Sequence, residues 1–123
     1  MRSETTIEPI RPGARVRISE GNDADPKWLV QFGARNGVLG TVVHFRTIPR
    51  GRHREAIVQL DRSVVFEDVI GSFLVLRLHD NTTGWESGTT VSVELCDFEP
   101  NTHFARCRGR SVTVETAAVC ELL

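Results

Sequence analysis

Hydrophobic and polar residues alternate along several short stretches of the chain, and this period of two is typical of β-strands with one buried face. The stretches are residues 14–18, 38–48 and 55–61, followed by three rows of alternating aliphatic residues: Leu74, Leu76 and Leu78; Val91, Val93 and Leu95; and Val112 and Val114. Leu76 and Val93 are therefore expected to be core residues on neighbouring strands. Six such segments, separated by turn signals at close spacing, predict an all-β architecture.

Parts of the pattern predict local irregularities and turns. Gly40 interrupts the stretch at 38–48 and is a candidate β-bulge. Residues 62–71 do not alternate regularly, so they are expected to form an irregular connection or a short edge strand. Asn36-Gly37, by contrast, is a strong signal for a tight turn before the strand at 38–48.

One segment has the features of a short helix. In DPKWLVQFG, residues 25–33, Asp25 suits the N-cap, Pro26 suits the first helical position and Gly33 suits the termination. A leucine and a phenylalanine follow Trp28 at i+1 and i+4, so the helix has one apolar face. The sequence therefore predicts a mostly β protein, a small SH3-like or related β-barrel with one short α-helix. Residues 13–123 are expected to form this single β-rich domain after a flexible N-terminal arm at residues 1–12.

Composition and charge narrow the classes of function. The chain has 123 residues and a net charge of −1, so no overall electrostatic attraction to nucleic acid or to an anionic membrane is expected. No stretch reaches 18 apolar residues, and the first residues lack the apolar core of a signal peptide. Three widely spaced cysteines, Cys96, Cys107 and Cys120, are then best interpreted as reduced thiols of a cytoplasmic protein without a membrane anchor.

Basic residues gather in two places. The candidate binding residues are Arg50, Arg52, His53 and Arg54 in one loop, and Arg106, Arg108 and Arg110 near the C-terminus. Guanidinium groups suit the recognition of phosphate or carboxylate, and the alternate spacing at 106–110 would place three of them on one face of a strand. No aromatic residues are interleaved with them as stacking platforms, so a solvated loop that protects a sheet edge is the simpler interpretation.

Trp85 lies in the polar stretch HDNTTGWESGTT, residues 79–90, between two apolar rows. The Asp, Asn, Ser and Gly residues of this stretch can form a turn without help from packing. Trp85 is therefore expected to cover an apolar surface. This surface is either the open end of the protein's own barrel or the surface of a partner, and Trp85 is a candidate binding residue in the second case.

Metal binding and catalysis have weaker support. Cys96, His103 and Cys107 fall within 12 residues but lack the tight Cys-x2–4-Cys pair of small zinc folds, so no metal or other cofactor is expected. Histidines and carboxylates such as His79 and Glu94 are available for acid–base chemistry, yet no motif pairs a nucleophile with a base. No catalytic residue is assigned, and whether the protein is an enzyme stays open, with a non-enzyme favoured.

Two stretches resemble known groups of proteins. From Gly13 to Leu60, the segments GARVRI, GVLGTVVHF and EAIVQLD are similar to the strands of small SH3-like barrels, including those of the KOW type that are associated with nucleic acids. Residues 71–100, GSFLVLRLHDNTTGWESGTTVSVELCDFEP, resemble small uncharacterised bacterial proteins carried as mobile integron gene cassettes. The preceding PKWL and VVQLD-like segments fit the same group, so the resemblance covers residues 13–100. The tail after residue 100 departs from that group because it contains no Trp. The resemblance implies a bacterial cytoplasmic accessory protein and implies no activity.

The expected function is therefore a non-catalytic binding or protein-interaction module. Its partner is expected to be another protein or a second copy of the chain, since a small β protein has exposed strand edges that favour pairing, and a homodimer is the simplest oligomer. An RNA- or DNA-binding barrel that uses the arginine clusters is the alternative, and a small hydrolase is a second alternative.

Overall fold

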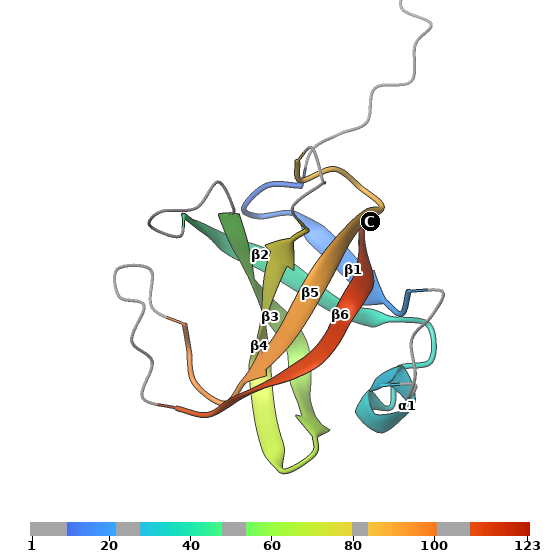
Figure 1. Ribbon diagram of the computed structural model, residues 1–123, viewed down its shortest axis with the longest axis vertical. Helices are drawn as coiled ribbons and strands as arrows, with labels where there is room; N and C mark the ends of the chain where they lie inside the picture. The colour runs from blue at the N-terminus through green and yellow to red at the C-terminus, as the bar shows by residue number, and fades with distance from the viewer. Residues whose placement is uncertain (1–9, 22–27, 48–53, 80–83, 101–108) are drawn as a thin grey trace, which may run out of the picture.

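The structure is a computed structural model that describes residues 10–21, 28–47, 54–79, 84–100 and 109–123. Within these residues, six antiparallel strands close into a barrel in sequence order (Figure 1). They are β1 (Arg15–Ser19), β2 (Val38–Thr47), β3 (Arg54–Phe66), β4 (Val69–Leu78), β5 (Thr89–Cys96) and β6 (Ser111–Leu122). Pairs such as Ile18 with Cys120 join β1 to β6 and complete the closure. The predicted small β-barrel with one short helix is confirmed.

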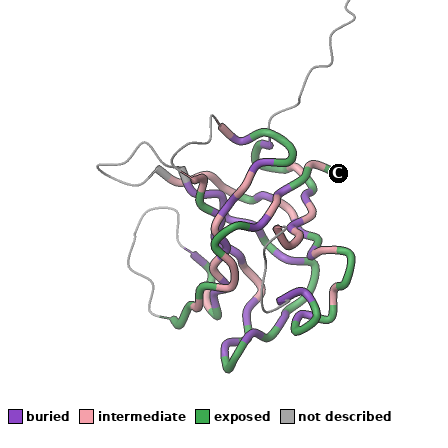
Figure 2. Tube along the Cα trace, turned by 45° about the vertical axis from the view of Figure 1, so that its right-hand side comes forward, coloured by how far each residue is buried: buried purple, intermediate pink, exposed green. Residues whose placement is uncertain are grey.

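Alternation along the strands places one set of side chains inside the barrel. Buried and exposed positions therefore follow each other along the strands, as Figure 2 shows. Leu76 and Val93 are directly opposite each other on β4 and β5, and both are 0% exposed. The prediction that these two residues are core neighbours is confirmed, and so is the register that it implies.

The helix α1 (Trp28–Phe32) lies against one end of the barrel. Trp28, Leu29 and Phe32 are buried, as their spacing predicts. The helix ends as expected at Gly33, which has a positive φ of 70°. The N–H of Gly33 bonds to the carbonyl of Val30, and the N–H of the next residue, 34, bonds to that of Leu29, which is the Schellman pattern. The predicted N-cap Asp25 and Pro26 lie outside the described residues.

The interpretation of residues 62–71 is wrong. These residues belong to two long strands, because β3 continues to Phe66 and pairs with β4 across a two-residue turn at Glu67 and Asp68. The alternation is lost because β3 has several more residues than β4 between the pairs Gln59–Phe73 and Val64–Gly71. The extra residues bend β3 away from the ladder.

The expected bulge at Gly40 is also wrong, since the register of β2 shifts between Val42 and His44. Gly40 has another role. A Cβ at this position would lie 2.6 Å from Cγ1 of Val58 and 2.7 Å from the carbonyl oxygen of Gln59. The backbones of β2 and β3 can therefore approach closely only because residue 40 has no side chain.

The expected N-terminal arm at residues 1–12 is described only from residue 10 onward. Ile10 is 1% exposed and belongs to the core cluster. Its N–H donates a hydrogen bond to the carbonyl of Trp85, 2.8 Å away. Residues 10–12 therefore cross one end of the barrel beside Trp85.

Candidate functional site

A row of charged side chains on the outer face of the barrel contains a buried carboxylate, that of Glu55. The side chains of Arg46, Glu55 and Arg77 lie side by side on β2, β3 and β4, because the three residues are in register. Glu55 is only 3% exposed although it points away from the core. A carboxylate that is removed from water needs strong partners, and Glu55 has two.

Each arginine binds a different oxygen of Glu55. Nε of Arg46 donates to Oε1 at 2.9 Å, and its Nη2 lies 2.7 Å from the same oxygen. Nε of Arg77 donates to Oε2 at 3.1 Å, and its Nη2 also contacts Oε2. The side chain of Arg46 is 18% exposed and that of Arg77 is 51% exposed. Glu55 therefore fixes the orientation of a guanidinium group that still reaches solvent.

Beside this row, the outer face has a small apolar cluster. Ile57, Val75 and Cys96 are buried there, outside the barrel interior, and two phenylalanines, Phe73 and Phe98, pack against them. The cluster follows the register of β3, β4 and β5, in which Ile57 pairs with Val75 and Phe73 pairs with Cys96. The outer face thus combines Arg77 with two partly exposed phenylalanines, and both residue types are enriched in protein interfaces.

A shallow crevice of about 50 Å³ adjoins Arg77. Val75 and Arg77 form one side, and Ser92, Glu94 and Thr113 form much of the other. Glu94 faces outward, as its alternation with Val93 and Leu95 predicts, and it accepts a hydrogen bond from Ser111. This volume is far below that of a typical small-molecule pocket, which is about 300–1,000 Å³, so the crevice fits at most part of one side chain.

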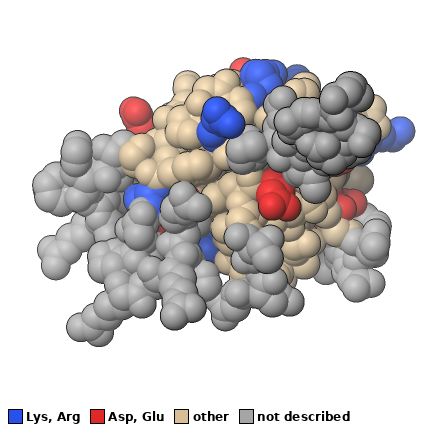
Figure 3. Space-filling model, turned by 90° about the horizontal axis from the view of Figure 1, so that it is seen from above, with Lys and Arg blue, Asp and Glu red and all other residues tan. Residues whose placement is uncertain are grey.

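Most of the predicted arginine clusters lie outside the described residues: Arg50, Arg52, His53, Arg106 and Arg108. The backbone of Arg54 opens β3 opposite Thr47. Arg110 lies just before β6 and forms an ion pair with Asp68, 2.9 Å away. On the face seen in Figure 3, the described basic and acidic side chains are interspersed rather than separated by sign.

Trp85 is buried, with 4% of its surface exposed. Its ring stacks on that of Phe45, with centroids 5.5 Å apart and planes 21° apart. Both residues belong to or pack against the main core, so Trp85 covers an end of the barrel of its own chain. This arrangement agrees with the interpretation that Trp85 covers the open end of the protein's own barrel. Its ring is therefore not available on the surface for a partner.

The cysteine and histidine candidates are only partly described. Cys96 is buried in the outer apolar cluster, whereas His103 and Cys107 lie outside the described residues. Burial raises the pKa of the Cys120 thiol to about 12, with a further contribution from the charge of Glu121. Among the described residues, no group of three His, Cys, Asp or Glu side chains could hold a metal ion.

Histidines and carboxylates that are available for acid–base chemistry contact the protein's own backbone and side chains. Nε2 of His79 lies 2.5 Å from the carbonyl oxygen of Thr116. Asp97 accepts a hydrogen bond from the backbone N–H of Arg110, and the N–H of Asp97 donates to the carbonyl of Arg110. Asp97 and Arg110 thus join the two ends of the connection between β5 and β6.

The alternation at residues 55–61 places Glu55 on the outer face, but it does not indicate that Glu55 is buried or that it has two partners. Arg46 and Arg77 are 9 and 22 residues away along the chain, and only the strand register brings them to Glu55. The available signal was an acidic residue in one alternating stretch with arginines at outward positions of two others. The order and the register of the strands must be known before this signal can predict that the three side chains meet.

Comparison with known proteins identifies no relative: no family model matches the chain, and no curated protein and no solved structure matches it either. Within the described residues, no helix has the length and apolar character needed to cross a membrane.

Proposed function

We propose that the protein is a non-catalytic interaction module that binds another protein through the outer face of β3, β4 and β5. The observation that carries the proposal is the buried Glu55 between Arg46 and Arg77. Even a fully paired carboxylate adds little net stability when it is buried, because its loss of hydration offsets the attraction of its partners, so folding alone does not explain why Glu55 is there. Holding the Arg77 guanidinium in place before binding is a role beyond folding, because less entropy is then lost in the complex.

The surroundings of Arg77 favour a protein over a small molecule. Nε and Nη2 of Arg77 bind Glu55, and Nη1 has no partner among the described residues. Phe73 and Phe98 lie close to the same face and are only partly buried. Arginine and aromatic residues supply much of the binding energy in protein interfaces. The crevice beside them accommodates part of a side chain rather than a whole ligand.

The partner that this face fits is a second copy of the chain. Arg77 and Glu94 carry opposite charges on neighbouring strands and line the same crevice with Val75. In a two-fold dimer, each residue of one copy meets a complementary residue of the other. An axis near Val75 would bring Arg77 of each copy to Glu94 of the other, so the face can pair with itself.

The test is the mass in solution, measured by sedimentation velocity from about 1 to 100 μM, a range that detects micromolar dimers. The unmodified protein should dimerise, Glu94→Arg should be monomeric, and Glu86→Arg, which makes the same change on an exposed residue elsewhere, should still dimerise. A monomer at the highest concentration, or a dimer that tolerates Glu94→Arg, would contradict the proposal. Salt-sensitive binding of nucleic acid by that monomer would favour the alternative based on the arginine clusters.

A further inference from the structure

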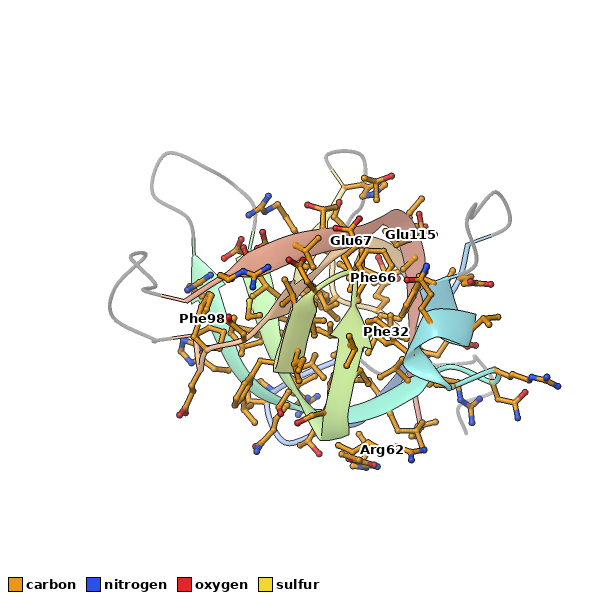
Figure 4. The ribbon with its side chains drawn as sticks, turned by 90° about the horizontal axis from the view of Figure 1, so that it is seen from below. Phe32, Arg62, Phe66, Glu67, Phe98 and Glu115 are labelled. Atoms are coloured by element: carbon orange, nitrogen blue, oxygen red, sulfur yellow. The ribbon has the colours of Figure 1, made fainter. Side chains whose placement is uncertain are left out.

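A cleft of about 330 Å³ lies where α1 meets the barrel, at a different place from the charged row of Glu55. Two irregularities of the chain create it. After the Schellman turn at Gly33, the chain loops through residues 34–37 before β2 begins, and the bend in β3 moves Asp61 and Arg62 out of the ladder. Figure 4 shows Phe32 and Phe66 close together beside α1, with Arg62 near the bend of β3.

One wall of the cleft is apolar. Phe32, Val38 and Val64 are almost fully buried there, and Leu39 is 38% exposed. Phe32 is held from two sides by edge-to-face contacts, with Trp28 at 5.0 Å and with Phe66 at 6.1 Å between ring centroids. These contacts hold Phe32 in place in the wall. The volume and the apolar lining of the cleft fit the lower end of the range for small-molecule sites.

The polar rim of the cleft carries net positive charge. Arg35, Asn36, Asp61 and Arg62 line it. Asp61 is already neutralised by Arg15, which binds both carboxylate oxygens at 2.6 and 2.7 Å. The side chains of Arg35 and Arg62 have no hydrogen bond or ion pair within the described residues. Two guanidinium groups without an anion thus stand beside an apolar wall.

We propose that this cleft binds a small organic anion, a carboxylate or phosphate group on a compact apolar body. Arg35 and Arg62 would bind the acid group, because a guanidinium donates paired hydrogen bonds to either oxyanion. The apolar body would lie against Phe32 and Leu39. Asn36 can donate one further hydrogen bond from its amide. The proposal does not depend on the dimer, because none of these residues lies in the charged row or in the outer apolar cluster.

The test uses the unmodified full chain and isothermal titration calorimetry with four probes. These are benzoate, phenyl phosphate, the neutral benzamide and inorganic phosphate. The two organic anions should bind, and benzamide and inorganic phosphate should each bind at least about tenfold more weakly, because each lacks one half of the recognition. The stronger of the two organic anions then identifies the acid group that the cleft prefers.

Variants assign the binding to the cleft. Arg35→Gln and Arg62→Gln should each weaken the binding of the tighter-binding organic anion by about tenfold or more, which is the scale of a lost charge-assisted hydrogen bond. Arg11→Gln removes an exposed arginine that does not line the cleft and should leave the affinity unchanged. The proposal is overturned if neither organic anion binds at millimolar concentration. It is equally overturned if benzamide binds as well as benzoate, or if all three variants bind alike.

Discussion

The two ends of the barrel are closed by tryptophans in different ways. At one end, Trp28 is held by a helix and packs edge-to-face on Phe32, which in turn contacts Phe66. At the other end, Trp85 comes from a connection between strands and stacks on the single ring of Phe45, and its carbonyl accepts a bond from Ile10. Both tryptophans are at least 95% buried, and both indole N–H groups lack a partner in the described part of the chain.

The difference shows what a helix adds to a barrel end. A single stacked ring from a strand connection is enough to bury an apolar surface, because ring contacts and area provide the stabilisation. A helix also needs connecting segments that lead the chain back to the sheet. The segment that follows α1 lines the 330 Å³ cleft between the helix and the barrel. The Trp85 end is thus primarily structural, and the α1 end combines closure with a recess that can take a ligand.

The largest expected effect is at the Trp85 end. Trp85→Ala should lower the free energy of unfolding by about 3–5 kcal/mol, because a fully buried ring and its contact with Phe45 are lost. Trp85→Phe is the control, since it keeps an aromatic ring and removes the unpaired N–H, and its loss should be much smaller. Urea denaturation at several protein concentrations measures both. A loss for Trp85→Ala that disappears at high concentration would show that Trp85 stabilises an interface instead.

A second comparison concerns two carboxylates on β3. Glu55 is buried between two arginines, whereas Asp61 forms a well-aligned bidentate pair with Arg15 in which both side chains are nearly half exposed. Glu55→Gln should lower the free energy of unfolding by about 1.5–3 kcal/mol, the scale of hydrogen bonds to charged groups. Asp61→Asn makes the matched change at an exposed site and should have a clearly smaller effect. Equal losses in urea denaturation would mean that burial does not distinguish the two sites.

The contrast between Glu55 and the regular inward rows also explains which features could be predicted from the sequence. Both periodicities used above depend only on local spacing: the period of two identified inward rows such as Leu76 and Val93, and the i, i+1 and i+4 spacing identified the apolar face of the helix at Trp28. Neither could identify the burial of Glu55, because that requires the neighbours on β2 and β4. Local spacing could not predict the α1 cleft for the same reason, since Phe32, Leu39 and Arg62 come together only when the barrel closes.

The turn between β3 and β4 was missed for a chemical reason. Tight hairpins usually place Gly, Asn or Asp where φ is positive, and here that position is Glu67, with φ of 55°. Without a typical turn residue, the pairing of residues 64–66 with 69–71 gave no signal in the sequence.

Glu67 therefore provides a smaller prediction, of opposite sign. Glu67→Gly should raise the free energy of unfolding by about 0.5–1 kcal/mol, because glycine adopts positive φ without the steric cost of a Cβ. Glu67→Ala is the matched control, since it removes the same charge but keeps the Cβ, and it should give no gain. Thermal unfolding measures both, and a similar rise for both variants would assign the effect to charge rather than to backbone strain.

The smallest expected effect is the pH dependence of the exposed pair at the α1 end. The hydrogen bonds and charge of Arg15 lower the pKa of Asp61 below its usual value of 3.8, although partial desolvation opposes this. A lowered pKa in the folded state means that the pair stabilises the protein above the unfolded-state pKa, and that this contribution is lost as the pH falls through the folded-state value. Below about pH 4, the stability of Asp61→Asn should therefore fall less steeply than that of the unmodified protein.

Urea midpoints between pH 2 and pH 7, measured at low salt and again in 1 M salt, test this, because screening should reduce the difference between the two proteins. Parallel curves at low salt would show that the Arg15–Asp61 pair does not persist in solution, and the rim of the cleft would then carry an additional free carboxylate beside Arg62.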